Sequence, residues 1–196
     1  MATDILAFEQ FRQFLYTITP ITNSDFEKSI SFFRTKDLKK SEVWVDYNTV
    51  CREIAFIKKG LLKTSYFDER GLEITSCFCT PNSMASSFKS FLNQSPSQLA
   101  IHALEETSVL TIHHGKLHKL FQEIPVWERL FRIIMEKEYE KLWDYTEGMK
   151  TELAKERYQK LFEEQPEVIQ KAPVQDIATY LGITRETLSR IRKKST

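Results

Sequence analysis

Hydrophobic positions near the N-terminus recur every three or four residues, which predicts a helix over residues 3–17. The positions that form this apolar stripe are Ile5, Phe8, Phe11, Leu15 and Ile18. Pro20 ends the segment, and Ser24 and Glu27 have the spacing of a capping box. A second helix is therefore expected from Ser24 to about Phe33.

From about Thr35 to Ile112 the pattern changes to short runs rich in β-branched and aromatic residues. The strands predicted from these runs are residues 43–47, 53–59, 61–67, 72–78 and 108–112. Gly60 separates two of them and residues 68–71 separate another two, as expected for hairpins. Regularly spaced short strands predict an antiparallel β-roll or jelly roll, and the Ser-rich residues 85–95 are expected to hold a short helix.

A long apolar helix is predicted after Pro125, a residue that suits the first helical turn. Neither Gly nor Pro interrupts residues 126–147, which would span about 33 Å. We assign the apolar positions to one seam with Trp127 and Phe131 on its flank: Val126, Leu130, Ile134, Leu142, Tyr145, Met149 and Leu153. Such a helix, between a β-domain and a helical end, predicts a dimer interface; the alternative is a helix that packs only on its own β-domain.

Residues 174–196 have the pattern of two short helices joined by a tight turn. Before them, a helical segment is expected between Gly148 and about Glu164, and Pro166 and Pro173 bracket a linker. The C-terminal pair is therefore expected to form a unit of its own.

The two C-terminal helices are expected to cross at Ala178, because a crossing of this kind needs a small residue. Gly182 tolerates a positive φ at the end of the first helix, and Thr184 is the expected N-cap of the second. The residues expected between the two helices are Ile177, Leu181, Ile183, Leu188 and Ile191. Together these features predict a helix-turn-helix.

The opposite side of the second helix is polar and basic, with five Lys/Arg and one Glu in residues 185–196. The N-terminal end of a recognition helix contacts base edges; Arg reads guanine and Glu accepts from cytosine. We predict that the DNA contacts come from Thr184, Arg185, Glu186, Ser189, Arg190 and Lys193. The alternative is a surface hairpin with a solvated basic tail.

Composition is that of an ordinary globular protein, with 196 residues, 41% hydrophobic and 28% charged, and a net charge of +1. Because the net charge is small, affinity for nucleic acid must come from a local patch. Residues 150–196 carry ten Lys/Arg and seven Asp/Glu, whereas residues 1–149 carry 18 and 20. This asymmetry favours a patch at the C-terminal end.

The three cysteines, Cys51, Cys77 and Cys79, are too few for a disulfide framework and suit a reducing compartment. The N-terminus lacks the layout of a signal peptide, and no apolar run is long enough to cross a membrane. A cytoplasmic protein with no membrane contact is expected.

Enzymatic chemistry, a metal and a cofactor are not expected. Cys77 and Cys79 share one face of a predicted strand, where neighbours seldom have disulfide geometry. His114 and His118 stand four residues apart, but no H-E-x-x-H arrangement surrounds them. A solvated helix start accounts for these histidines better than a zinc site.

The order of the predicted elements resembles the Crp/Fnr family of bacterial transcription regulators over nearly the whole chain. The Arg-Glu-Thr-x-x-Arg core within residues 183–193 is similar to the recognition helix of the cyclic-AMP receptor protein and its relatives. Residues 51–63 and 186–193 are most similar in texture to members from Bacteroidetes. The resemblance implies a cyclic-nucleotide-binding-like β-roll, base contacts from Arg185, Glu186 and Arg190, and RNA polymerase as a partner.

The chain departs from the family at the phosphate-binding cassette, where the family has Gly-Glu and then Arg-Ser or Arg-Thr. The corresponding positions here are Ser86-Ser87 and Ser97-Gln98, and no arginine occurs in residues 71–128. A buried cyclic phosphate needs a charge-assisted partner. We therefore predict that the chain does not bind cyclic AMP in the family's mode.

The same four residues, Ser86, Ser87, Ser97 and Gln98, are neutral and mostly hydroxyl-bearing. In the family this region faces the ligand cavity, so we expect an effector pocket here that suits an uncharged small molecule. An ordinary surface loop with no ligand is an equal alternative.

The family usually continues from its recognition helix into a β-hairpin wing, whereas this chain ends at Thr196. The phosphate contacts of a wing are then expected either to be missing or to come from Arg192, Lys193 and Lys194.

Taken together, the pattern predicts an α+β protein in three parts. Residues 1–124 form a β-roll sensor domain, residues 125–150 a dimerisation helix and residues 151–196 a DNA-binding helix-turn-helix. The expected function is a homodimeric, sequence-specific transcription regulator on a palindromic site. Two alternatives stay open: a small-molecule-binding β-barrel with a structural C-terminal hairpin, and a constitutive DNA-binding dimer without an effector.

Overall fold

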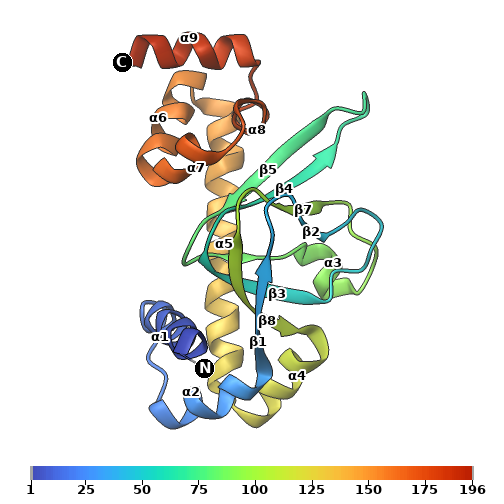
Figure 1. The fold of residues 1–196 in the computed structure, drawn as a ribbon, viewed down its shortest axis with the longest axis vertical. Helices are drawn as coiled ribbons and strands as arrows, with labels where there is room; N and C mark the ends of the chain where they lie inside the picture. The colour runs from blue at the N-terminus through green and yellow to red at the C-terminus, as the bar shows by residue number, and fades with distance from the viewer. Residues whose placement is uncertain (1, 196) are drawn as a thin grey trace.

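The computed structural model describes residues 2–195, and describes side chains for residues 8–193. A C-terminal helical lobe lies at one end of the longest axis of the molecule, and a long helix runs along that axis beside the β-roll to reach it (Figure 1). The helices are α1 (Ala2–Tyr16), α2 (Asn23–Ser29), the 3₁₀ turn η1 (Ile30–Phe32), α3 (Phe88–Asn93), α4 (His114–Glu123), α5 (Val126–Thr151), α6 (Ala154–Glu164), α7 (Pro166–Lys171), α8 (Val174–Tyr180) and α9 (Arg185–Ser195). Within the described residues, no helix is both long enough and apolar enough to cross a membrane.

The β-roll consists of two four-stranded antiparallel sheets with the orders β1-β8-β3-β6 and β2-β7-β4-β5. The strands are β1 (Phe33–Leu38), β2 (Val43–Val45), β3 (Glu53–Lys59), β4 (Leu62–Phe67), β5 (Glu73–Cys79), β6 (Met84–Ala85), β7 (Ala100–Ala103) and β8 (Thr107–His113). The α+β fold with an antiparallel roll is thus confirmed. Strands β1, β6 and β7 were not predicted, because β1 is mostly polar and the other two are very short.

The hairpin predicted at Gly60 is wrong, because β3 and β4 lie in different sheets. The chain crosses between the sheets at Gly60, which has a φ of +102°, and a Cβ there would lie 2.5 Å from Thr107 Cα. The glycine is required by this close approach and not by a two-residue turn. The hairpin predicted at residues 68–71 is confirmed: β4 pairs with β5, and the Gly71 amide donates to Asp68 O.

Helix α1 covers the β-roll, as its apolar stripe predicts. Phe11 and Leu15 are buried, and the Phe11 ring contacts Phe56 of β3 and Trp127 of α5. The side chain of Ile5, which belongs to the predicted stripe, lies outside the described residues. These contacts join the N-terminal helix, the sheet and the long helix in one hydrophobic core.

The capping box predicted at Ser24 and Glu27 is wrong. Helix α2 begins earlier, and the hydroxyl of Thr22 caps it by accepting a hydrogen bond from the Asp25 amide at 3.1 Å. Threonine is a good N-cap, and the acidic residue of the first turn favours this start. The helix also ends earlier than predicted, at Ser29, and the chain continues through η1 into β1.

Helix α5 runs along the longest axis of the molecule and joins the β-roll to the C-terminal lobe (Figure 1). Leu130 and Ile134 are buried in the β-roll core, whereas the Tyr145 hydroxyl donates to Tyr180 O of the lobe at 2.9 Å. Helix α5 ends at Thr151, close to the predicted end near residue 150, and the next helix begins at Ala154 and not directly after Gly148.

The single seam predicted for α5 is also divided differently in the structure. Its N-terminal residues face the β-roll and Tyr145 faces the lobe, which leaves a separate exposed apolar face in the middle. Tyr139, Leu142 and Trp143 are 63%, 61% and 60% exposed, respectively. Of these three, only Leu142 belonged to the predicted seam, because the pattern could not show which turns the β-roll and the lobe cover.

Candidate nucleic-acid interface

The turn between α8 and α9 is a Schellman motif. The Ile183 amide donates to Ala178 O at 2.9 Å, and the Gly182 amide donates to Thr179 O at 3.1 Å. Gly182 has a φ of +67°, as predicted for a residue that ends the first helix. The Thr184 hydroxyl then accepts from the Thr187 amide at 3.3 Å, which confirms Thr184 as the N-cap of α9.

The inner faces of α8 and α9 pack as the sequence predicts. Ile177, Ala178, Leu181 and Leu188 are buried. Ile183 and Ile191, the other two predicted positions, are partly buried against the same cluster. The helix-turn-helix geometry is therefore present, with its small residue at the crossing.

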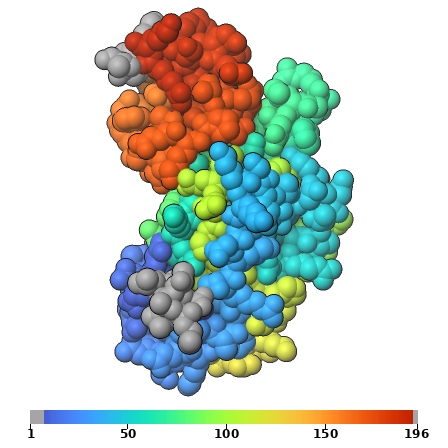
Figure 2. Space-filling view, viewed as in Figure 1, coloured from blue at the N-terminus to red at the C-terminus, as the bar shows by residue number. Residues whose placement is uncertain are grey.

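The outer face of α9 carries every residue predicted to contact DNA. The exposed residues are Thr184, Arg185, Glu186, Ser189, Arg190 and Lys193. Helix α9 forms one end of the molecule, away from the β-roll (Figure 2). The structure thus brings these side chains together on a single solvent-facing surface.

Hydrogen bonds between neighbouring groups order this surface. Arg190 Nη2 donates to the Thr187 hydroxyl at 3.1 Å, which directs the guanidinium toward the N-terminal part of α9. The backbone amide of Glu186 and the Thr184 hydroxyl donate to the Glu186 carboxylate and hold its pKa below the usual range. Glu186 is therefore ionised at neutral pH and acts as an acceptor beside two arginines.

The phosphate-contact role predicted for Arg192 does not fit its position. The Arg192 guanidinium lies over the Tyr158 ring of α6, 6.0 Å from its centroid, and its Nε and Nη2 are buried. Lys193 is exposed, as a phosphate contact requires. The side chain of Lys194 lies outside the described residues.

The C-terminal lobe is docked on the β4–β5 hairpin through an apolar contact. Leu61 and Phe78 belong to the hydrophobic cluster formed by α6, α7, α8 and α9. The Phe78 ring meets the Tyr180 ring edge-on at 5.2 Å. The β-roll therefore supplies part of the core on which the helix-turn-helix rests.

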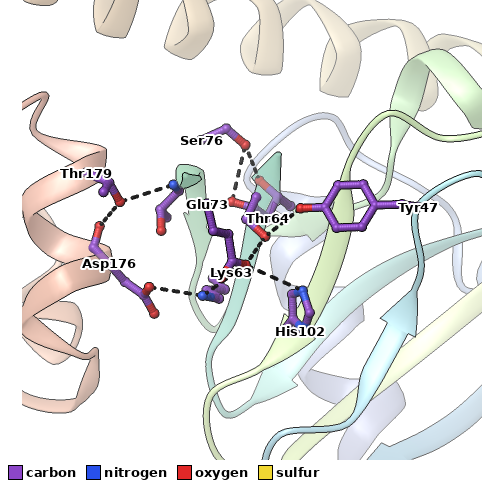
Figure 3. A network of polar contacts seen from close by, with 10 residues as sticks. Tyr47, Lys63, Thr64, Glu73, Ser76, His102, Asp176 and Thr179 are labelled. Carbon is purple, nitrogen blue, oxygen red and sulfur yellow. Dashed lines mark hydrogen bonds and ion pairs between the residues drawn. The ribbon is translucent and has the colours of Figure 1, made fainter. Parts of the chain in front are cut away.

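A polar network crosses the same junction (Figure 3). Lys63 of β4 and Asp176 of α8 form an ion pair at 3.0 Å, and Lys63 also lies 3.3 Å from Glu73 of β5. The Thr75 amide donates to the Thr179 hydroxyl of α8 at 3.2 Å. The sequence pattern did not single out these residues, because Asp176 is an ordinary first-turn acid and Lys63 is a lone cation in a strand.

Arg157 of α6 ties the end of α5 to the helix-turn-helix. Its Nε and Nη2 donate to Leu181 O at 3.3 and 2.9 Å, and its Nη1 donates to Glu152 O. This residue was also missed, since nothing in the sequence distinguishes it from a solvated arginine. It satisfies carbonyl groups at two helix ends, where intrahelical donors are lacking.

The predicted effector residues divide into a buried group and an exposed one. Ser87 and Ser97 are buried with their hydroxyl oxygens 2.7 Å apart, and the buried Ser86 hydroxyl donates to Glu53 O at 3.1 Å. Gln98 is exposed. The serine hydroxyls thus hydrogen-bond within the protein, and a ligand would have to compete for them.

Two hollows are lined by other residues, although Cys51 and Glu53 of the first one hydrogen-bond to Ser86. One, of about 310 Å³, lies on the β-roll and is lined by Lys36, Trp44, Val45, Thr49, Val50, Cys51, Arg52, Glu53 and His113. The other, of about 340 Å³, lies on the exposed face of α5 and is lined by Tyr139, Glu140, Trp143 and Asp144.

Cys51, Cys77 and Cys79 are all free thiols. Among residues 2–195, no group of three or more His, Cys, Asp or Glu side chains is arranged to hold a metal ion. Nε2 atoms of His114 and His118 lie 3.3 Å apart at the start of α4.

With this geometry in place, comparison with known proteins shows what the chain is similar to. Residues 174–194 match the model of a family described as "Bacterial regulatory proteins, crp family". No curated protein matches the chain.

Solved structures extend the likeness from the motif to the fold. FixK2 from Bradyrhizobium japonicum is 21% identical with a TM-score of 0.69, over 83% of each chain. The catabolite activator protein of Thermus thermophilus is 14% identical with a TM-score of 0.59, over 92% of this chain and 85% of that one. The c-di-GMP-responsive global regulator CLP of Xanthomonas campestris is 13% identical with a TM-score of 0.69, over 88% and 91%.

The fold is therefore that of Crp/Fnr-type transcription regulators with a cyclic-nucleotide-binding-like domain, and the C-terminal motif is that of the crp family. This confirms the resemblance read from the sequence. The similarity to members from Bacteroidetes stays a prediction.

Proposed function

We propose that this chain is a sequence-specific DNA-binding transcription regulator that acts as a homodimer on a palindromic site. The observation that carries the proposal is the outer face of α9, where Arg185, Glu186 and Arg190 are exposed together. The buried Leu188 on the opposite side of α9 fixes that face outward. No catalytic role is part of this proposal.

In this proposal, three consecutive segments of the chain have different roles. Residues 1–124 would act as the sensor, residues 125–150 as the dimerisation helix and residues 151–196 as the DNA-binding unit. RNA polymerase is the further partner that a regulator of this class would engage. The identity of the effector, or its absence in a constitutive dimer, is a separate question from the DNA-binding role.

The dimer proposal rests on the exposed face of α5. Tyr139 and Leu142 lie on the same side of the helix, and Met135 and Thr146 extend it at the alternating spacing of four and three residues found in coiled coils. A second copy packed on this face would remove its large apolar side chains from water. Two recognition helices related by a two-fold axis would then read half-sites about 34 Å apart.

The DNA-reading role can be tested by fluorescence anisotropy with a palindrome obtained by in-vitro selection. Arg185→Ala is expected to weaken binding by about 1–3 kcal/mol and to relax specificity at one base position. Arg129→Ala, which removes the same charge from an exposed position on α5, is the matched control. Equal effects of the two substitutions would show that Arg185 acts only through net charge and would contradict its role.

A further inference from the structure

The ion pair between Lys63 and Asp176 is buried at the junction between the β-roll and the helix-turn-helix. The side chains of Lys63 and Asp176 are only 10% and 13% exposed, and Lys63 Nζ lies 3.0 Å from Asp176 Oδ1. The two residues are 113 positions apart in the sequence. Figure 3 shows the pair between β4 and α8.

Burial makes this pair different from an ordinary surface contact. Removing charges from water is costly, so removing one partner of a buried pair leaves the other charge uncompensated and is strongly destabilising. A second ion pair at the same junction, Lys171 with Glu105, has a similar distance of 2.8 Å but side chains that are 46% and 31% exposed. Solvent screens such a pair, and its contribution is expected to be small.

The ion pair is one of two polar attachments that hold α8 on the hairpin. The other is the bond from the Thr75 amide of β5 to the Thr179 hydroxyl, which in turn donates to Asp176 O at 3.1 Å. These two polar contacts add to the packing of Tyr180 on Phe78 in fixing the direction of the short helix α8. Because the Schellman turn joins α8 directly to α9, the direction of α9 is fixed as well.

The attachment continues into the β-roll through Glu73. Its Oε1 lies 3.3 Å from Lys63 Nζ, accepts from the Ser65 hydroxyl at 2.6 Å and lies 3.8 Å from His102 Nε2. The Tyr47 hydroxyl lies 3.4 Å from Ser65 Oγ. A rearrangement of β2, β4 or β7 would therefore change the distance between the Glu73 carboxylate and the Lys63 ammonium group.

We propose that Lys63 is a positioning residue that locks the recognition helix to the β4–β5 hairpin through Asp176, and that Glu73 links this lock to the sensor domain. The proposal rests on the proposed function, because it gives α9 the role of reading DNA. Lys63 itself lies on the β-roll and is assigned no DNA contact. Its role is to hold the reading face in one orientation.

The lock can be tested by hydrogen exchange in the full-length protein without DNA. Lys63→Met is expected to accelerate exchange of the Thr75 amide and of α8 about tenfold or more, because the uncompensated Asp176 carboxylate draws water into the junction. Exchange in β1 and β8 should not change. Lys171→Met, which breaks the exposed pair, should alter exchange by less than about twofold.

The double variant Lys63→Met/Asp176→Leu separates the ion pair from simple loss of packing. It is expected to restore slow exchange at Thr75, because both charges of the buried pair are gone and the remaining Glu73 side chain is 37% exposed to solvent. If Lys63→Met behaves like Lys171→Met, or if the double variant exchanges as fast as the single one, the lock is refuted.

DNA binding by the same variants distinguishes this proposal from the proposed function. Lys63→Met should weaken binding to the selected palindrome about tenfold, and the double variant should recover it. If exchange responds as expected but wild-type protein binds no DNA, the lock stands and the DNA-binding role fails. If wild type binds DNA and none of the variants changes exchange, the DNA-binding role stands and the lock fails.

Discussion

Glu186 is the acidic member of a basic reading face, and its ionisation matters for what that face can read. An ionised carboxylate accepts from cytosine N4 and disfavours a neighbouring phosphate, whereas Arg185 and Arg190 read guanine or bind phosphate. The hydrogen bonds from the Glu186 amide and the Thr184 hydroxyl lower its pKa, which adds to the ionisation that an exposed glutamate already has at neutral pH.

His102 gives a testable pH dependence. Burial lowers its pKa below the ordinary value, although Glu73 acts in the opposite direction and Lys63 in the same one. The unfolded chain therefore takes up a proton near pH 6.5, where the folded chain does not. The free energy of unfolding should decrease as the pH falls from about 6.5 toward the lower folded pKa, and should not depend on this group above that range.

Urea unfolding at pH 7.5 and 5.5 measures this effect. His102→Gln should show a smaller loss of stability between the two pH values than wild type does. Burial also lowers the pKa of His114, so part of the loss should remain in the variant. An unchanged loss in His102→Gln would contradict the assignment.

At the scale of elements, α5 has two contact regions with an exposed segment between them. Its first turns belong to the β-roll core through Leu130, its last turns support the lobe through Tyr145, and its middle presents Tyr139, Leu142 and Trp143 to solvent. A soluble helix that keeps three large apolar side chains exposed together is typical of an interaction surface.

Introducing a charge on this face should disrupt the proposed dimer. Leu142→Glu places a carboxylate where the partner helix would pack, and burial of an unpaired charge is unfavourable. Analytical ultracentrifugation should show a dimer for wild type and a monomer for this variant. Lys137→Glu, an exposed position on the other side of α5, changes a charge on the same helix and should remain dimeric. A dimer that persists in Leu142→Glu would move the interface elsewhere.

The elements that the sequence predicted well are those whose pattern is local. Gly182 and Thr184 mark the turn of the helix-turn-helix because the backbone itself requires a positive φ and a cap there. Gly60 was assigned to a hairpin because a glycine between two strands does not reveal whether they pair. The sequence pattern does not predict the polar strand β1, because β1 lacks a regular alternation of apolar and polar residues. It is a strand because its backbone pairs with β8.

In the candidate site, too, the sequence predicts local features but not contacts between distant elements. The outer face of α9 follows from helical spacing, so all six predicted DNA-contact residues lie together and exposed. Lys63 and Asp176 could not be paired from the sequence, because only the docking of the lobe brings residues so far apart into contact. Arg192 was misassigned for a related reason: its neighbour Tyr158 belongs to another helix.

At the scale of the whole molecule, the β-roll has the fold of a cyclic-nucleotide-binding domain without the charges that such a ligand needs. Residues 71–128 contain no arginine, and the hydroxyls of Ser87 and Ser97 contact each other. Isothermal titration with cyclic AMP is expected to show no binding in the micromolar range, since a buried phosphate would lack a charged partner. Micromolar binding would contradict this account of the β-roll.

The central claim is that the protein binds DNA as a homodimer, in which two α9 helices related by a two-fold axis read one palindromic site. The most direct test is in-vitro selection of DNA bound by the full-length protein at a stated salt concentration, because salt alone changes affinity by orders of magnitude. We predict enrichment of an inverted repeat whose half-sites are centred about one helical turn, 34 Å, apart. Recovery of no consensus sequence, or of a single unrepeated site, would contradict the claim.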